Sequence, residues 1–142
     1  GRTFYVADSS RQTIWACDYD TLTGTPRNKR VFADLRALGT APDGATVDAE
    51  GHVWSALVRT GTIARFDPVG RVVMQFEFPV RYPTSLAFGG PDLDVLYVTS
   101  ISKSVRFEDT TEDAGGLFAV KGLGVHHTTA VASAEVVENR RP

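Results

Sequence analysis

The sequence predicts an all-β protein, built as a β-propeller of about three blades, and two observations lead to this prediction. Short runs with strand character alternate with turns rich in Gly, Pro and Asp about every 6 to 12 residues, as in sandwiches, barrels and propellers. The chain also resembles itself at spacings in the forties, the repeat length of propeller blades. Helical periodicity is nearly absent.

Ten runs are expected to be strands because they are rich in β-branched and aromatic residues and end at turn-forming residues. A short helical turn is expected within Val31–Leu38. In chain order, the expected strands are Thr3–Ala7, Thr13–Tyr19, Arg27–Phe32, Ala45–Asp48, Val53–Leu57, Thr62–Asp67, Val72–Phe78, Ser85–Phe88, Val95–Ser100 and Gly116–Val120.

The internal repeat groups these strands into units of about four. At a spacing of about 49 residues, Tyr5 falls on Trp54 and Ile14 on Ile63. At about 41 residues, Pro42 falls on Pro83 and Asp43 on Thr84, while an insertion in a turn brings Trp54 onto Tyr97. One blade cannot bury both of its faces, so such units stack on one another.

The bulk composition is that of one globular domain covering residues 1–142. Apolar residues make up 42% and charged residues 23%, and the net charge of −2 indicates neither a nucleic acid nor an anionic membrane as partner. Because Cys17 is the single cysteine, we expect a reducing, cytoplasmic setting. No signal peptide is visible, and strand-like sequence follows Gly1 so closely that we expect the chain to continue something longer.

Several groups of polar residues are better explained by a structural role than by a catalytic or metal-binding role. Asp18 and Asp20 resemble the start of a calcium loop, but its later positions lack the required ligand and Gly, which favours a solvated turn. The pair His126–His127 has no third ligand at a suitable spacing. Ser9–Ser10 is interpreted as a turn, Cys17 as a core thiol, and the series Arg59, Arg65 and Arg71 as a solvated edge.

Asp43 is the principal candidate site residue. It lies in Pro42-Asp43-Gly44, directly before the inner strand that begins at Ala45, and the repeat places Thr84 at the equivalent position. In a propeller these positions crowd toward the central channel. From the residues alone two interpretations stay open, because Pro-Asp-Gly is also a good turn sequence.

Four segments of the chain form a recognisable series: YVADSSRQTIWACDYDTLTG, PDGATVDAEGHVWSALVRTGTIARFDPVGRVV, PTSLAFGGPDLDVLYVTS and AGGLFAVKGLGV. In this order and at compatible spacing, they resemble the gluconolactonase/senescence-marker-protein/regucalcin-like family. The resemblance extends from Arg2 to Val125 and covers the C-terminal half of the family's domain. It implies half of a six-bladed propeller that holds one divalent metal ion (Ca, Zn, Mn or Mg) and hydrolyses sugar lactones.

The resemblance also implies site residues. Asp43 matches the family's aspartate, which is a metal ligand and also the favoured general base or water-positioning group. One repeat unit further on, Thr84 and Ser85 are weaker candidates for lining the channel. The family's glutamate and two asparagine ligands belong to the N-terminal half, and neither Asn28 nor Asn139 matches them. The tail 126–142 departs from the family pattern and is expected to be a divergent, loosely ordered segment.

Two hypotheses follow for a chain that carries one of four ligands. In the first, it is a lactone hydrolase that acts together with an N-terminal half. In the second, it is a non-catalytic fragment or binding module that associates with itself to complete a ring.

Overall fold

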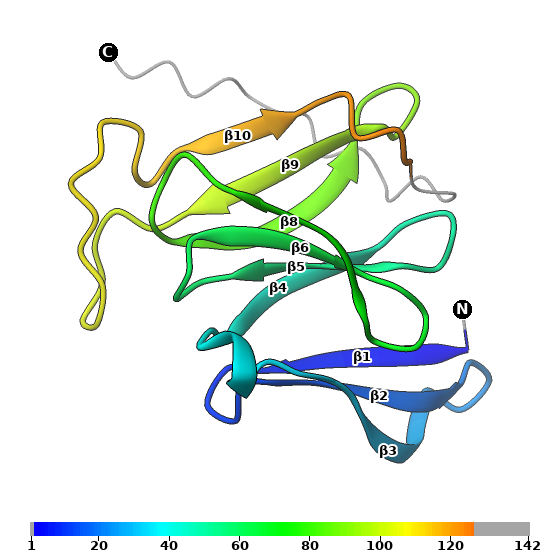
Figure 1. Ribbon diagram of the computed structural model, residues 1–142. Helices are drawn as coiled ribbons and strands as arrows, with labels where there is room; N and C mark the ends of the chain where they lie inside the picture. The colour runs from blue at the N-terminus through cyan, green and yellow to red at the C-terminus, as the bar shows by residue number, and fades with distance from the viewer. Residues whose placement is uncertain (1, 127–142) are drawn as a thin grey trace.

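The structure, a computed structural model that describes residues 2–126, consists of three antiparallel β-sheets stacked one on another (Figure 1). Sheet 1 has the order β1-β2-β3, sheet 2 the order β4-β5-β6-β7 and sheet 3 the order β10-β9-β8. The strands are β1 (Thr3–Asp8), β2 (Thr13–Asp20), β3 (Thr25–Asp34), β4 (Pro42–Val47), β5 (Val53–Leu57), β6 (Thr62–Phe66), β7 (Val72–Glu77), β8 (Pro83–Gly89), β9 (Val95–Ser100) and β10 (Leu117–Val120).

All ten expected strands are confirmed, with ends that differ by a few residues. The strand that lengthens most is β3, which starts at Thr25 and continues to Asp34, so the expected helical turn shrinks to one 3-10 turn, Arg36–Leu38. This turn ends at Gly39, whose φ of 64° lies in the left-handed region that glycine adopts at little cost.

Sheet 2 is the centre of the stack because both of its faces are covered. All five residues of β5 are buried. Side chains alternate between the two faces of a strand, so Val53 and Leu57 join the core shared with sheet 1, whereas Trp54 and Ala56 join the core shared with sheet 3. This explains why β5 has no polar alternation, as expected for a strand buried on both sides.

Two apolar clusters fill the spaces between the sheets. The cluster between sheets 1 and 2 is centred on Ile14, Leu35 and Phe66. The cluster between sheets 2 and 3 is centred on Trp54, whose ring meets Phe88 edge-on at a centroid distance of 5.8 Å. Each cluster therefore joins sheet 2 to one of its two neighbours.

The prediction of a solvated edge is wrong for Arg65. Its side chain is only 11% exposed and donates through Nε to the fully buried carboxylate of Asp48 at 2.8 Å. The same carboxylate accepts from the indole Nε1 of Trp54 at 2.9 Å. The alternation that suggested an edge could not show this, because the partner comes from the turn before β5. Arg59 and Arg71 are exposed as predicted.

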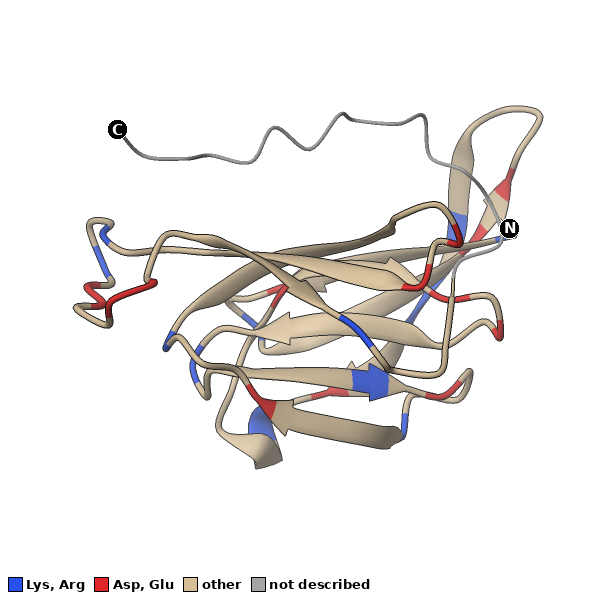
Figure 2. Cartoon of the chain, turned by 90° about the horizontal axis from the view of Figure 1, so that it is seen from above, with Lys and Arg blue, Asp and Glu red and all other residues tan. Residues whose placement is uncertain are grey.

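The remaining sequence predictions have mixed outcomes. Cys17 is buried, as a core thiol should be. His126 is exposed and its carbonyl accepts the amide of Ala49 at 2.7 Å, whereas His127 and the rest of the tail lie outside the described residues. Acidic and basic residues are interspersed along the chain (Figure 2). In the part of the chain that the structure describes, no helix has both the length and the apolar character needed to cross a bilayer.

Candidate functional site

Asp43 lies in a β-bulge at the start of β4. Pro42 pairs with Leu57, but the next aligned pair is Ala45 with Ser55, so Asp43 and Gly44 together stand opposite one residue of β5. An interpretation of Pro42-Asp43-Gly44 as a free turn is therefore corrected, because these residues belong to β4 itself. Bulges re-aim side chains and are frequent next to active sites.

Sheet 3 repeats this irregularity at the equivalent place. Pro83 pairs with Ser100 and Ser85 with Thr99, which leaves Thr84 out of the ladder of β8. The self-alignment of the sequence had paired Asp43 with Thr84, and both are bulge residues. The hydroxyl of Thr84 is engaged, since its Oγ1 lies 2.9 Å from Oγ1 of Thr99.

The carboxylate of Asp43 differs from other carboxylates of the protein in its surroundings. Hydrogen bonds from neighbouring side chains and turn amides lower the pKa of Asp8, Asp20, Asp67 and Asp109. Asp43 is half-buried, and this burial raises its pKa. Within residues 2–126, no hydrogen bond or ion pair reaches its oxygen atoms, so they are free to accept a proton, a cation or a water molecule.

The structure brings Ser85 against the bulge that carries Asp43. Strand β4 packs against β8 across the space between sheets 2 and 3. A Cβ atom built on Gly44 would lie 2.5 Å from Oγ of Ser85 and 2.6 Å from its Cα. Ser85 is exposed and Thr84 partly buried, so both remain candidates for lining a channel.

Sequence reasoning missed Ser9, which follows β1. Its Oγ donates to the carbonyl of Pro42 at 2.7 Å, across the boundary between sheets 1 and 2. The pair Ser9–Ser10 was interpreted only as a turn, because nothing local in the sequence links it to a carbonyl 33 positions away. The alternation of residues within a strand does not predict such contacts between sheets.

The described residues fit one metal ligand rather than a complete metal site. Nowhere in the described part of the chain do three or more His, Cys, Asp or Glu side chains come together in a way that could hold an ion. The free, half-buried carboxylate of Asp43 has the oxygen donors that hard divalent cations prefer. Further ligands would have to come from outside the described residues.

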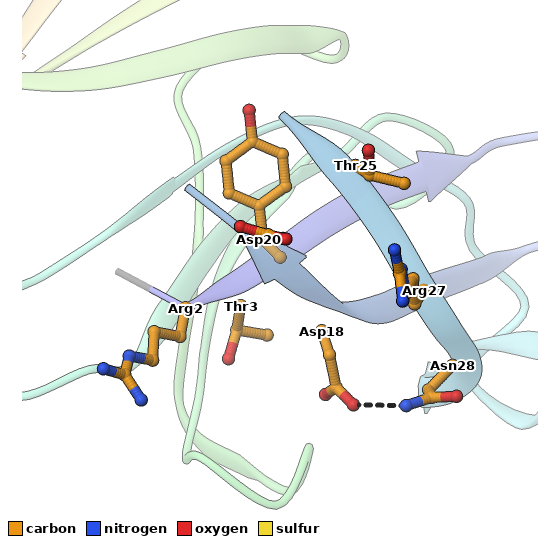
Figure 3. Close-up of a pocket in the computed structure, with 8 residues that line it drawn as sticks. Arg2, Thr3, Asp18, Asp20, Thr25, Arg27 and Asn28 are labelled. Atoms are coloured by element: carbon orange, nitrogen blue, oxygen red, sulfur yellow. Dashed lines mark hydrogen bonds between the residues drawn. The ribbon is translucent and has the colours of Figure 1, made fainter. Parts of the chain in front are cut away.

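An open pocket of about 460 Å³ lies elsewhere, at the end of sheet 1 where β2 meets β3 (Figure 3). Its carboxylates are already engaged. Asp18 accepts from Asn28 and Arg30, each at 2.8 Å, and Asp20 accepts from the amide of Leu22. The pocket includes none of the candidate site residues. It is lined by Arg2, Thr3, Asp18, Tyr19, Asp20, Thr25, Arg27 and Asn28.

Comparison with known proteins identifies the class and then the family. The fold matches that of a solved calcium-binding protein, regucalcin from Agrobacterium tumefaciens, with a TM-score of 0.76 and 32% identity, over 90% of this chain and 44% of that one. The family model "SMP-30/Gluconolactonase/LRE-like region" matches residues 1–102. The chain belongs to this family, which confirms the resemblance found in its motifs.

Two curated relatives show how much of the family's length is present. Regucalcin of Gallus gallus is 38% identical over 127 residues, which are 87% of this chain and 42% of the relative. Pentonolactonase XacC of Haloferax volcanii is 37% identical over 121 residues, which are 81% of this chain and 42% of the relative. The chain thus spans less than half the length of the relatives it matches.

Proposed function

We propose that this chain contributes to the metal-dependent hydrolysis of sugar lactones, with Asp43 as metal ligand and general base. The observation that carries the proposal is the carboxylate of Asp43, which is half-buried, has a raised pKa and is free of partners among the described residues. Membership of the family supports the reaction class, and one matched relative is named a pentonolactonase.

In this proposal, Asp43 transfers a proton during hydrolysis of the lactone. A water molecule attacks the lactone carbonyl carbon, a new C–O bond forms and the ring C–O bond breaks. Asp43 takes the proton of the water and returns it to the ring oxygen, which leaves as the hydroxyl group of a hydroxy acid. A raised pKa brings the carboxylate closer to the working pH, which favours this role.

The metal ion would be Ca, Zn, Mn or Mg, since a site rich in oxygen ligands accepts each of them. When bound, such an ion supplies charge that polarises a carbonyl group and lowers the pKa of water. Asp43 is the residue of this chain that would hold it, while the hydroxyl groups of Thr84 and Ser85 would line the same channel.

We further propose that the three sheets are three blades of a six-bladed ring, on the evidence of an uncovered face at each end of the stack. At the first end, Val53 and Ala64 of sheet 2 are fully buried against sheet 1. Their equivalents in the repeat are Phe4, which is 45% exposed, and Trp15, which is only partly buried. A further sheet would cover these side chains as sheet 1 covers sheet 2.

The other end of the stack supports the same proposal. Trp54 on β5 is fully buried by sheet 3, whereas its equivalent Tyr97 on β9 is only partly buried. Leu117, which pairs with Thr99 on the same sheet, is 54% exposed. An N-terminal half of the propeller would cover both ends and supply the missing ligands.

The catalytic proposal is tested by measuring hydrolysis of a panel of sugar lactones with each of the four ions. Asp43→Asn keeps the shape of the side chain but removes the base, and Asp92→Asn is a matched control in an exposed turn. With an N-terminal half of the propeller present to supply the remaining ligands, we expect ion-dependent hydrolysis that Asp43→Asn abolishes and Asp92→Asn leaves unchanged. Hydrolysis that needs no metal and survives Asp43→Asn would overturn the proposal.

The alternative function is a non-catalytic module that associates with itself through the same two uncovered faces. Exposed apolar sheet faces favour such pairing, and two copies of three sheets would also make a ring of six. Sedimentation separates the two candidates. A dimer without lactonase activity favours the alternative, and a folded monomer counts against it.

A further inference from the structure

The bulge that carries Asp43 is fixed from the side of sheet 1 by a single hydroxyl group. Ser9 Oγ donates to the carbonyl oxygen of Pro42, the residue directly before Asp43, at 2.7 Å. The backbone ladder between β4 and β5 shifts register between Pro42 and Ala45, so it constrains this segment less than a regular ladder would. The hydrogen bond therefore acts where the strand itself is least constrained.

The same bulge is fixed from the side of sheet 3 by a close approach of two backbones. A side chain on Gly44 would collide with Ser85, including its Cα atom at 2.6 Å. Gly44 is not among the glycines with positive φ, so its backbone conformation does not demand glycine. The small size of Gly44 instead allows β4 to lie directly against β8.

The two contacts involve the residues on either side of Asp43: Ser9 bonds Pro42, and Ser85 packs against Gly44. The carbonyl of Gly44 also lies 3.4 Å from Oγ of Ser55, a longer contact to the partner strand β5. The carbonyl groups of the two residues that flank Asp43 are thus contacted by side-chain hydroxyls, while the carboxylate of Asp43 has no partner among residues 2–126. A free but well-placed carboxylate is what a metal ligand or a base requires, since a small displacement of a catalytic group has a large effect on rate.

We propose that Ser9 is a positioning residue for Asp43, and that the Gly44–Ser85 contact is its counterpart on the opposite side. Together they make the placement of one carboxylate depend on all three sheets. This inference rests on the proposed function for the chemical role of the Asp43 carboxylate. The contacts that hold Asp43 in place do not depend on that function.

The test follows the ionisation of Asp43 directly. The pKa of its carboxyl group is measured by NMR titration in the wild type, in Ser9→Ala and in Ser10→Ala. Ser10 is a matched control because its hydroxyl leaves the same turn and bonds the carboxylate of Asp8 instead, at 2.7 Å. We expect the pKa of Asp43 to move down toward its ordinary value in Ser9→Ala, since a loosened bulge exposes the carboxylate to water, and to stay unchanged in Ser10→Ala.

A merely structural role of Ser9 would lower thermal stability without moving this pKa. An unchanged pKa in a folded Ser9→Ala variant overturns the positioning role. Ser9→Thr keeps a hydroxyl group and is expected to restore the wild-type value. Because Gly44→Ala brings a backbone collision, Ser85→Gly serves as the second variant, and its widened contact is expected to move the pKa in the same direction.

Binding of Mn²⁺ separates this inference from the function on which it rests. If Asp43 is a metal ligand, Ser9→Ala is expected to weaken Mn²⁺ binding about tenfold, the usual cost of losing a group that orients a ligand. A shifted pKa without any Mn²⁺ bound at Asp43 in the wild type, even with an N-terminal half of the propeller added, would retain the positioning role and reject the metal. A wild-type Mn²⁺ affinity in Ser9→Ala, together with an unchanged pKa, would reject the positioning role alone.

Discussion

Two turns of the protein have the same backbone design but different surroundings, and this pair makes a sharp test of the packing argument. In the turn after β4, Asp48 Oδ1 accepts the amides of Glu50 and His52. In the turn after β6, Asp67 Oδ1 accepts amides at the same two spacings. The second carboxylate oxygen of Asp48 meets buried donors on Trp54 and Arg65, whereas that of Asp67 meets Arg71, which is 79% exposed.

The difference in cost between the two truncations follows from these partners. Asp48→Ala and Asp67→Ala each lose the two bonds to turn amides, which cancel in the comparison. Asp48→Ala also removes the buried acceptor of the Trp54 indole and the Arg65 guanidinium. The loss of each hydrogen bond to a charged group lowers the free energy of unfolding by about 1.5–3 kcal/mol. Arg65 keeps Glu50 at 2.7 Å, so the two losses do not add fully, and we expect about 3 kcal/mol in total.

The assay is thermal and urea-induced unfolding of both variants beside the wild type. A difference of about 3 kcal/mol corresponds to roughly 6–12 °C in Tm for a chain of this size. Asp67→Ala is expected to be the milder variant, because an exposed pair such as that with Arg71 is worth little. Equal losses in the two variants would refute the reasoning, since they would mean that the buried partners of Asp48 contribute nothing beyond the turn.

Two further predictions concern the bulge residue and the glycines. Asp43→Asn is expected to be more stable than the wild type at pH 7, because burial raises the pKa of Asp43 and stability is lost as the pH rises through that value. The gain should vanish at a pH below 3.8, where Asp43 is protonated in both states, and urea unfolding at the two pH values checks this. Gly70→Ala should destabilise far more than Gly51→Ala, as compared by Tm. Both glycines have φ above 80°, but a Cβ on Gly70 collides with the carbonyl of Phe32, whereas Gly51 faces open space.

Much of the fold could be predicted from the sequence because it depends on periodic signals. Alternation within strands and turn residues between them identified all ten strands, including β10, the shortest. The repeat also predicted that Asp43 and Thr84 occupy equivalent places, and both are bulge residues in the structure. Strand ends were less accurate, since strands such as β3 extend into sequence that reads as a turn.

The candidate site was predictable only in part, because its contacts join sheets that are far apart in the sequence. Asp43 was named from the family motif, and the structure adds that its carboxylate is half-buried and has no hydrogen-bond or ion-pair partner among residues 2–126. The partners of its neighbours, Ser9 and Ser85, come from the two adjacent sheets. No periodic signal points to Ser9, and Ser85 was named only as a residue that lines the channel, not as a contact of Gly44. Arg65 was misjudged because its partner Asp48 lies 17 positions earlier, in the turn between β4 and β5 of the same sheet, where the alternation of β6 gives no sign of it.

The complete burial of β5 has a consequence for local unfolding of the protein. Each apolar cluster joins sheet 2 to one outer sheet, so an outer sheet can detach while sheet 2 keeps its packing against the other. Opening of β5 requires both cores to be lost together, so its amide protons should be the last to exchange with solvent. Sheets 1 and 3 are expected to unfold locally while sheet 2 stays folded. Folding is expected to begin in sheet 2 and to extend to sheets 1 and 3.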